Sequence, residues 1–358
     1  MAAARRLQRV GGHLLPPREG PVSHGSAATL AATAAASGGQ IIVSVRTARP
    51  IAPDGTPSSD WGGIQGLGQI CVAVETADGS VGYGIGGGGQ PGIGIIEQAL
   101  RPLLIGRDAS DVEGLWEAMY THTLAYGRKG LAIMAISGVD LALWDLRGKA
   151  AGQTVAEVLG APAAKISQPV ASYRTAPSDL SEAAAEGYKF IKLSIGGMDP
   201  VAQADEIVAT VERARAAIGY EIELSCDATM KWTDKEAVLA LCERLAPFGL
   251  AFLEEPLPSD DPEGYAWLTA RSPIPIAGGE HAQTAAEFAE LMAMNAMNIY
   301  QPDVAWCGGL TQLVEIFRLG REHGVTVYPH RGAEVWSLHA IVALAADVSS
   351  QATCRCCL

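Results

Sequence analysis

Six short apolar runs decide the fold of this chain: FIKLSIG (190–196), EIELSCDAT (221–229), LAFLEEPL (250–257), IPIAGGE (274–280), NIYQPDV (298–304) and VTVYPHR (325–331). A seventh run, PVASYRT (169–175), precedes them, and helical stretches separate the runs. Strands that alternate with helices at this spacing form parallel βαβ units, and seven or eight units favour a closed barrel. A doubly wound open sheet is the alternative, but no glycine-rich phosphate-binding sequence follows an early strand. The sequence therefore predicts an α/β fold built on a parallel barrel.

The last six runs each carry a charged or ionisable residue toward the carboxyl end: Lys192, Asp227, Glu254, Glu280, Asp303 and His330. The last five of these residues are 23 to 27 positions apart, which is the length of one βα unit. The carboxyl ends of the strands of a parallel barrel meet at one rim, where active sites of this architecture lie. We therefore expect the six side chains to converge on one site.

Three of these residues, Asp227, Glu254 and Glu280, are acids on adjacent strands. Unpaired carboxylates a few ångströms apart raise one another's pKa steeply, and a divalent cation removes this conflict. Oxygen ligands without cysteine or several histidines favour Mg²⁺ over zinc or copper. Any one acid alone is equally typical of a helix cap or a surface ion pair, but three at this spacing predict a magnesium site.

The next two strands end in Asp303 and His330, which are predicted to pair. A carboxylate that accepts from one imidazole nitrogen raises the basicity of the other, which suits a general base near neutral pH. Lys192 is predicted to neutralise a substrate carboxylate or a developing enolate, with an ion pair to Asp227 as the alternative. For His281, which directly follows Glu280, a substrate contact and simple packing at the rim are both open.

The residues before the barrel predict a separate α+β domain over residues 40–165. IIVSVRTA (41–48) and GQICVAVETADGSVGYGIG (68–86) alternate β-branched residues around a turn at Asp78–Gly79, which indicates a small antiparallel sheet. Helical periodicity follows, with one apolar face in the stretch 131–152. The glycine-rich GIGGGGQPG (84–92) lacks the context of a phosphate-binding loop and is interpreted as a flexible loop. The barrel domain is expected over residues 166–347, with a disordered Ala/Arg-rich extension at 1–39 and an atypical tail at 348–358.

The composition limits the classes of partner. The 358 residues carry a formal charge of −13, and the pI is near 5.0. Nucleic acids and membrane surfaces need a basic face, so neither is an expected partner. Four of the seven cysteines are scattered through apolar segments without a disulfide pattern, which favours a reducing, cytoplasmic compartment. No run of eighteen apolar residues predicts a membrane span, although the arginines of residues 1–39 are also compatible with a transit peptide.

Six motifs together resemble the enolase superfamily: KLS (192–194), CDAT (226–229), LEEP (253–256), AGGEH (277–281), QPDVAWCGGL (301–310) and PHRG (329–332). The resemblance runs from about residue 41 to residue 347 and implies a modified TIM barrel of the (β/α)7β type with an N-terminal α+β capping domain. It implies Asp227, Glu254 and Glu280 as Mg²⁺ ligands. The dyad of His330 and Asp303 marks the mandelate racemase subgroup.

The motifs GEH (279–281) and PHRG (329–332) resemble those of the rhamnonate and lyxonate dehydratases of that subgroup. The resemblance therefore implies a hydro-lyase (EC 4.2.1 type) that converts a sugar acid, an aldonate, to a 2-keto-3-deoxy acid. The subgroup often has a second lysine base where this chain has Ser194, which disfavours a two-base racemase. Epimerisation remains the alternative within the fold, and a binding protein without turnover is the alternative outside catalysis.

The resemblance has three further implications. The capping domain is expected to close over the site, with Trp61 and Arg128 as candidate substrate contacts. Homo-oligomers are common in the subgroup and are expected here. The family's eighth strand carries a glutamate that contacts the enolate, but DVSSQATCRCCL (347–358) lacks strand periodicity, so we expect the eighth strand to be missing.

Overall fold

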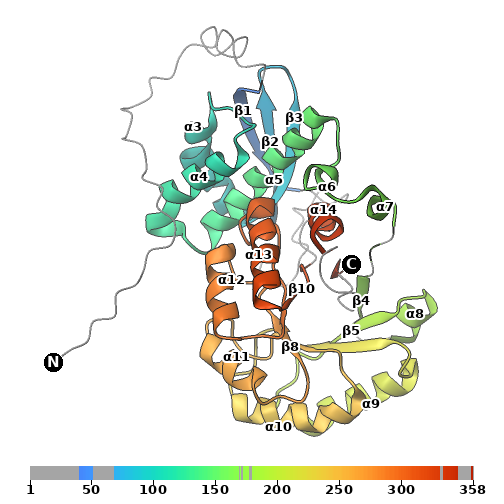
Figure 1. Ribbon diagram of the computed structural model, residues 1–358. Helices are drawn as coiled ribbons and strands as arrows, with labels where there is room; N and C mark the ends of the chain where they lie inside the picture. The colour runs from blue at the N-terminus through green and yellow to red at the C-terminus, as the bar shows by residue number, and fades with distance from the viewer. Residues whose placement is uncertain are drawn as a thin grey trace, which may run out of the picture.

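Two sheets organise the chain (Figure 1). The computed structural model describes residues 40–50, 68–168, 170, 172–176, 180–330, 334–345 and 356–357. An antiparallel sheet lies near the N-terminus, and a parallel sheet contains the strands predicted for the barrel. The predicted fold class is confirmed.

The antiparallel sheet has the order β1 (Ile42–Ala48), β2 (Gln69–Thr76) and β3 (Val81–Gly87). β2 and β3 form the predicted hairpin, in which Thr76 Oγ1 and the Ser80 N–H both donate to Asp78 Oδ1. Gly79 has a φ of +86°, a backbone conformation that glycine adopts without cost. The turn therefore follows from the local sequence.

The interpretation of residues 84–92 as a flexible loop is wrong. Residues 84–87 belong to β3, and a helix begins at Gly89. A Cβ on Gly84 would lie 2.1 Å from the Gly138 carbonyl oxygen of the long helix α5. The glycines thus allow β3 to pack directly on a helix backbone, which explains their number without flexibility.

Helices cover one side of this sheet and lead toward the barrel: α2 (Gly89–Ile95), a π-helical turn (Ile96–Leu100), α3 (Arg101–Leu104), α4 (Val112–Gly127), α5 (Leu131–Ala151), α6 (Val155–Val158) and α7 (Ala163–Ile166). The predicted apolar face of α5 is fully buried: Ile133, Ile136, Val139 and Leu143. α5 packs on β3 with one side and on a barrel helix, α13, with another, so it joins the two parts of the molecule.

The parallel sheet has the order β10-β9-β8-β7-β6-β5-β4-β11. Its strands are short: β4 (Ser172–Ala176), β5 (Phe190–Ser194), β6 (Glu223–Asp227), β7 (Leu253–Glu254), β8 (Ile276–Gly278), β9 (Ile299–Tyr300), β10 (Thr326–Val327) and β11 (Cys356–Cys357). The first seven of these are the seven predicted strands, in sequence order around the sheet. This order places their carboxyl ends along one rim.

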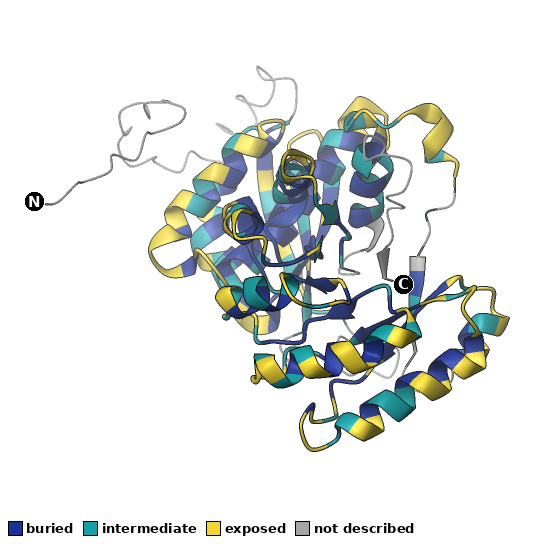
Figure 2. Cartoon of the chain, turned by 60° about the horizontal axis from the view of Figure 1, so that its bottom comes forward, coloured by how far each residue is buried: buried dark blue, intermediate teal, exposed yellow. Residues whose placement is uncertain are grey.

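Helices follow the strands and cover the outside of the sheet: α8 (Leu180–Ala185), α9 (Ala204–Ile218), α10 (Lys235–Leu245), a 3₁₀ turn (Ala246–Phe248), α11 (Pro262–Thr269), α12 (Thr284–Ala293), α13 (Gly309–His323) and α14 (Glu334–Leu344). Figure 2 shows α9 and α10 with one buried and one exposed side. Inside the sheet, the aromatic rings of Tyr173, Phe190 and Phe252 pack together with centroids 5.0 to 6.2 Å apart. Lys192 lies two residues after Phe190, so this cluster forms the floor under the predicted site.

The two ends of the parallel sheet differ from a closed barrel. In the described part of the chain, β10 pairs with β9 and β11 pairs with β4, but no pairing joins β10 to β11. The sequence predicts no strand in CRCCL, yet Cys356–Cys357 pair in parallel with Ser172–Tyr173. Backbone hydrogen bonds suffice for two residues and need no side-chain alternation, which explains why the pattern missed them. None of the described helices is long and apolar enough to cross a bilayer.

Candidate active site at the carboxyl ends of the strands

Lys192 lies between two of the predicted carboxylates. Asp227 and Glu254 are the last residues of the neighbouring strands β6 and β7 and stand opposite each other in register. The Lys192 Nζ donates to Glu254 Oε1 at 2.5 Å and forms an ion pair with Asp227 Oδ2 at 3.0 Å. All three residues are buried or half-buried, so the attraction is weakly screened. The predicted alternative of an ion pair to Asp227 is therefore present in this structure.

Glu254 is the least exposed of the three acids. Its other oxygen, Oε2, accepts a hydrogen bond of 2.9 Å from Gln301 Nε2, and the residue is 1% exposed. Burial raises the pKa of Glu254 to about 7, with Lys192 opposing this and Asp227 and Glu280 adding to it. Asp227, Glu254 and Glu280 are thus close enough to interact, as their spacing predicts.

His330 and Asp303 lie side by side after β10 and β9. The distance from His330 Nδ1 to Asp303 Oδ2 is 2.7 Å, and Asp303 Oδ1 accepts from the Ala305 N–H at 2.7 Å. An ionised carboxylate only accepts, so Nδ1 carries the proton in this pair. Burial would lower the pKa of His330, but Glu280 and then Asp303 raise it to about 9. The His330 Nε2 lies 3.3 Å from Glu280 Oε2, so the dyad faces the carboxylates.

His281 forms a second histidine–acid pair at the same rim. Its Nδ1 lies 3.1 Å from Glu255 Oε1 and 3.8 Å from Glu280 Oε1. The Trp306 ring lies next to both imidazoles, with centroids 5.6 Å from His281 and 5.4 Å from His330. Burial would lower the pKa of His281, but Glu255 and Glu280 raise it. The structure thus places His281 at the mouth of the site and leaves both of its predicted roles open.

The sequence interpretation did not include Glu255. Strand alternation would turn this residue away from Glu254, because successive side chains point to opposite faces. Glu255, however, has a φ of +42°, in the left-handed region that residues other than glycine rarely adopt. This kink ends the extended strand and leaves Glu255 3% exposed, with its carboxylate beside His281. The only signal in the sequence is the second acid of LEEP.

One group of side chains in the described part of the chain is compact enough to hold a metal ion, and it shares only Glu280 with the predicted set. Among the described residues, ligand atoms of Glu255, Glu280 and His281 lie within 4.8 Å of one another. The predicted set also contains Glu280, but its other two members, Asp227 and Glu254, form ion pairs with Lys192. Three buried polar atoms near these acids have no hydrogen-bond partner in the described residues: Ser225 Oγ, Thr229 Oγ1 and Gln301 Oε1. The site holds more carboxylates than cationic side chains, and unsatisfied polar atoms lie beside them. Both features fit a hard divalent cation that carries bound water.

The two candidate contacts from the capping domain differ in outcome. Trp61 lies outside the described residues. Arg128 is exposed at the end of α4, and the structure describes no contact between it and the carboxylates. Its neighbour Lys129, which the sequence interpretation missed, forms an ion pair of 2.5 Å with Glu287 of α12. Lys129 also lines a cavity of about 180 Å³ beside Glu255 and His281.

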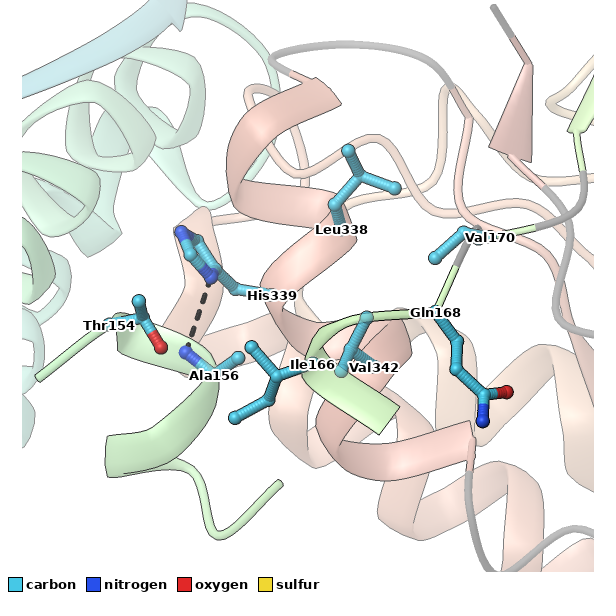
Figure 3. A pocket seen from close by; sticks show the side chains of 8 residues that line it. All are labelled: Thr154, Ala156, Ile166, Gln168, Val170, Leu338, His339 and Val342. Atoms are coloured by element: carbon cyan, nitrogen blue, oxygen red, sulfur yellow. Dashed lines mark hydrogen bonds between the residues drawn. The ribbon is translucent and has the colours of Figure 1, made fainter. Parts of the chain in front are cut away.

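A second cavity, of about 350 Å³, lies away from these acids between α6, α7 and α14 (Figure 3). Its walls are mostly apolar, and among the described residues that line it only His339 is titratable. His339 Nδ1 accepts a hydrogen bond of 3.2 Å from the Ala156 N–H, and burial lowers its pKa. This imidazole is already used in packing, so the carboxylate rim is the better candidate for chemistry.

These features define a class of two-domain α/β proteins, in which an antiparallel α+β domain joins a parallel barrel sheet with acids at its strand ends. Residues 58–160 match the N-terminal domain of the mandelate racemase/muconate lactonizing enzymes, and residues 177–356 match the enolase C-terminal domain-like family. The chain belongs to the enolase superfamily, in its mandelate racemase/muconate lactonizing enzyme branch.

Curated relatives and solved structures carry related names. The chain is 38% identical over 284 residues to L-rhamnonate dehydratase of Saccharopolyspora erythraea, covering 78% of this chain and 71% of the relative. It is 34% identical over 299 residues to arabinonate dehydratase of Saccharolobus solfataricus, covering 80% of each chain. Rhamnonate dehydratase from Gibberella zeae, solved in complex with Mg, aligns with a TM-score of 0.77 and 26% identity over 88% of this chain and 83% of that one. These relatives are dehydratases.

Proposed function

We propose that this protein dehydrates a sugar acid, an aldonate, to a 2-keto-3-deoxy acid with the help of Mg²⁺. The observation that carries the proposal is the His330–Asp303 pair, whose Nε2 faces Glu280 at the rim shared with Asp227 and Glu254. The names of the relatives support the same reaction class.

Asp227, Glu254 and Glu280 would hold the cation, because all three offer hard oxygen donors and carry excess negative charge. When bound, Mg²⁺ supplies a Lewis acid that stabilises negative charge developing on the substrate carboxylate. The alternative group of Glu255, Glu280 and His281 includes a nitrogen donor and suits a softer ion. We therefore assign the cation to the three strand-end acids.

His330 is the proposed base for the proton on C2. Asp303 keeps Nδ1 protonated, so that Nε2 is the nitrogen that accepts. Glu280 raises the pKa of His330, and withdrawal of this carboxylate toward a cation would leave Nε2 neutral near physiological pH. The imidazolium then returns its proton to the 3-hydroxyl, which leaves as water. The resulting enol tautomerises to the 2-keto-3-deoxy acid.

Lys192 stabilises the enediolate as a cation. Its Nζ contacts two carboxylates, and this pairing favours the ammonium over the neutral amine that a base requires. Ser194 stands where the related lysine base would be, so the opposite face of the substrate lacks a second base from this strand. Dehydration is thus favoured over epimerisation.

We also propose that residues 40–165 act as a capping domain over the barrel of residues 166–347. Two contacts between these parts support this role: the ion pair of Lys129 with Glu287 and the close approach of Gly87 to Trp306. A Cβ on Gly87 would lie 2.9 Å from the Trp306 ring, so the end of β3 contacts the aromatic wall next to His330.

The proposal is tested with a semicarbazide assay for 2-keto acids, run on a panel of aldonic acids in millimolar Mg²⁺. The wild-type protein should form product from a few of them, and His330→Asn should lose at least about 100-fold of the rate because the base is removed. Exchange of the C2 proton for deuterium without loss of water would favour epimerisation instead. A folded protein that binds Mg²⁺ but forms no product would support the binding-only alternative.

A further inference from the structure

Gln301 is buried at the centre of the site, although nothing in the proposed chemistry uses it. It directly follows β9, which lies between β8 and β10, and it is 1% exposed. Its backbone N–H donates to the Gly278 carbonyl oxygen at 2.8 Å. The backbone of Gln301 is therefore anchored to the neighbouring strand, and the side chain starts from a fixed point.

The amide of Gln301 holds one oxygen of Glu254. Its Nε2 donates to Glu254 Oε2 at 2.9 Å, while Lys192 Nζ donates to the other oxygen, Oε1. Glu254 is thus oriented from two sides by residues of β5 and of the segment after β9. The two donors differ in charge: a divalent cation repels the ammonium of Lys192 but leaves a neutral amide in place.

The other end of the amide is unsatisfied. Gln301 Oε1 is buried and has no hydrogen-bond partner among the described residues. Nε2 is assigned toward Glu254 because an ionised carboxylate accepts and cannot donate. A buried acceptor without a donor costs free energy, so the loaded site is expected to bring a donor, either water or a substrate hydroxyl.

We propose that Gln301 is a positioning residue for the cation: its amide fixes the carboxylate of Glu254 and thereby sets the affinity of the site for Mg²⁺. This inference rests on the proposed function, since it takes Glu254 as a Mg²⁺ ligand. Groups that orient a metal ligand through a hydrogen bond typically contribute a factor of about 10 to 100 in metal affinity. Gln301 acts through Glu254 and is not itself a ligand in this account.

The test measures Mg²⁺ binding without substrate, by isothermal titration calorimetry, with Mn²⁺ binding followed by electron paramagnetic resonance. Gln301→Met should raise the Kd for both ions by about 10- to 100-fold. Gln283→Met is the matched control: Gln283 is also buried, at 4% exposed, but its Oε1 accepts from the Gly130 N–H in the capping domain. The Kd of this control should stay at the wild-type value.

Gln301→Asn keeps an amide but is one methylene too short to reach Glu254, so it should raise the Kd as well. If Gln301→Met does not fold, as shown by the lack of a cooperative melt in EDTA, the Kd of Gln301→Asn tests the inference in its place. A Kd within about threefold of the wild type in a folded Gln301 variant would overturn the inference, because the expected loss is at least tenfold. The proposed function fails separately, when wild-type protein binds Mg²⁺ but forms no 2-keto acid. A wild-type protein without Mg²⁺ binding would overturn the assignment of Glu254 and this inference with it.

Discussion

At the scale of single residues, Glu280 links the proposed cation site to the proposed base His330. Its carboxylate lies 3.3 Å from His330 Nε2, and it belongs both to the compact group with Glu255 and His281 and to the proposed Mg²⁺ ligands. The same acid raises the pKa of the proposed base, and under the proposed assignment a bound cation would draw the carboxylate away from that base. The proposed assignment therefore implies that the protonation of His330 depends on the metal.

The metal-free protein should lose stability at alkaline pH as His330 loses its proton. The pKa of His330 is about 9 in the folded chain, above its ordinary value of 6.5. A raised pKa means that the folded state holds the proton more tightly, so the stabilisation is complete below about pH 6.5 and is lost as the pH rises through about 9. In EDTA, the free energy of unfolding of the wild type should fall relative to that of His330→Gln by up to about 3 kcal/mol over this range.

Urea unfolding at several pH values measures this difference. The coupling predicts that millimolar Mg²⁺ shifts the loss to lower pH, because Glu280 then no longer stabilises the imidazolium. A difference between the two proteins that stays constant with pH would contradict the assigned contact between His330 and Glu280.

At the scale of elements, α5 caps a helix of the other domain. The N-cap of α13, Gly308, has no side chain, and Asp140 of α5 takes its role. Asp140 Oδ2 accepts from the Thr311 N–H at 3.0 Å and Oδ1 accepts from Thr311 Oγ1 at 2.5 Å. Ser137 lies one turn earlier on α5, and its Oγ accepts from the Gly308 N–H at 3.0 Å. The first turn of α13, which follows the segment carrying Asp303 and Trp306, is thus held by α5.

Asp140→Ala should destabilise the protein by about 1–3 kcal/mol, since it leaves the partly buried N–H and hydroxyl of Thr311 in α13 without this acceptor. Burial raises the pKa of Asp140 to about 7, so ionisation is costly there and the loss reflects hydrogen bonds more than charge. Asp234→Ala is the control. Asp234 is an exposed N-cap of α10 that accepts from the Ala237 N–H, and its loss should cost about 1 kcal/mol. Equal shifts of the urea midpoint in the two variants would argue against the interdomain cap.

At the scale of the whole molecule, the site depends on several strands at once. Asp227 and Glu254 end β6 and β7 and are paired in register, and Glu280 lies two residues after β8, which pairs with β7. A ligand that binds these acids only in the folded chain stabilises all of these strands together. Mg²⁺ should therefore act on global unfolding and not on one loop.

Thermal melts test this expectation. A Mg²⁺ concentration of about 100 times the Kd should stabilise the wild type by about 2.7 kcal/mol and raise the Tm by several degrees. Glu280→Gln and Asp227→Asn should lose most of this increase. Glu315→Gln, which removes an exposed acid paired with Arg318 on α13, controls for general effects of negative charge and should keep it. An equal increase in all four proteins would mean that the ion binds elsewhere.

Sequence and structure agree best where the information is local. The seven strands, the hairpin at Asp78–Gly79 and the buried face of α5 all follow from periodicity and turn chemistry within short windows. The convergence of Asp227, Glu254, Glu280, Asp303 and His330 also follows, because a constant spacing in a parallel barrel repeats the same position on each strand.

The tertiary structure decided what depends on contacts between distant segments. Three contacts at the site join residues that are 26 to 62 positions apart: His281 with Glu255, Lys192 with Glu254, and Gln301 with Glu254. The same is true of the glycines of β3 against α5 and of Asp140 against α13. A sequence pattern records which residues share a face, and by itself it determined the family, the fold class and the rim of acids. Which oxygen meets which donor is set by packing between strands and domains, and only the folded chain specifies it.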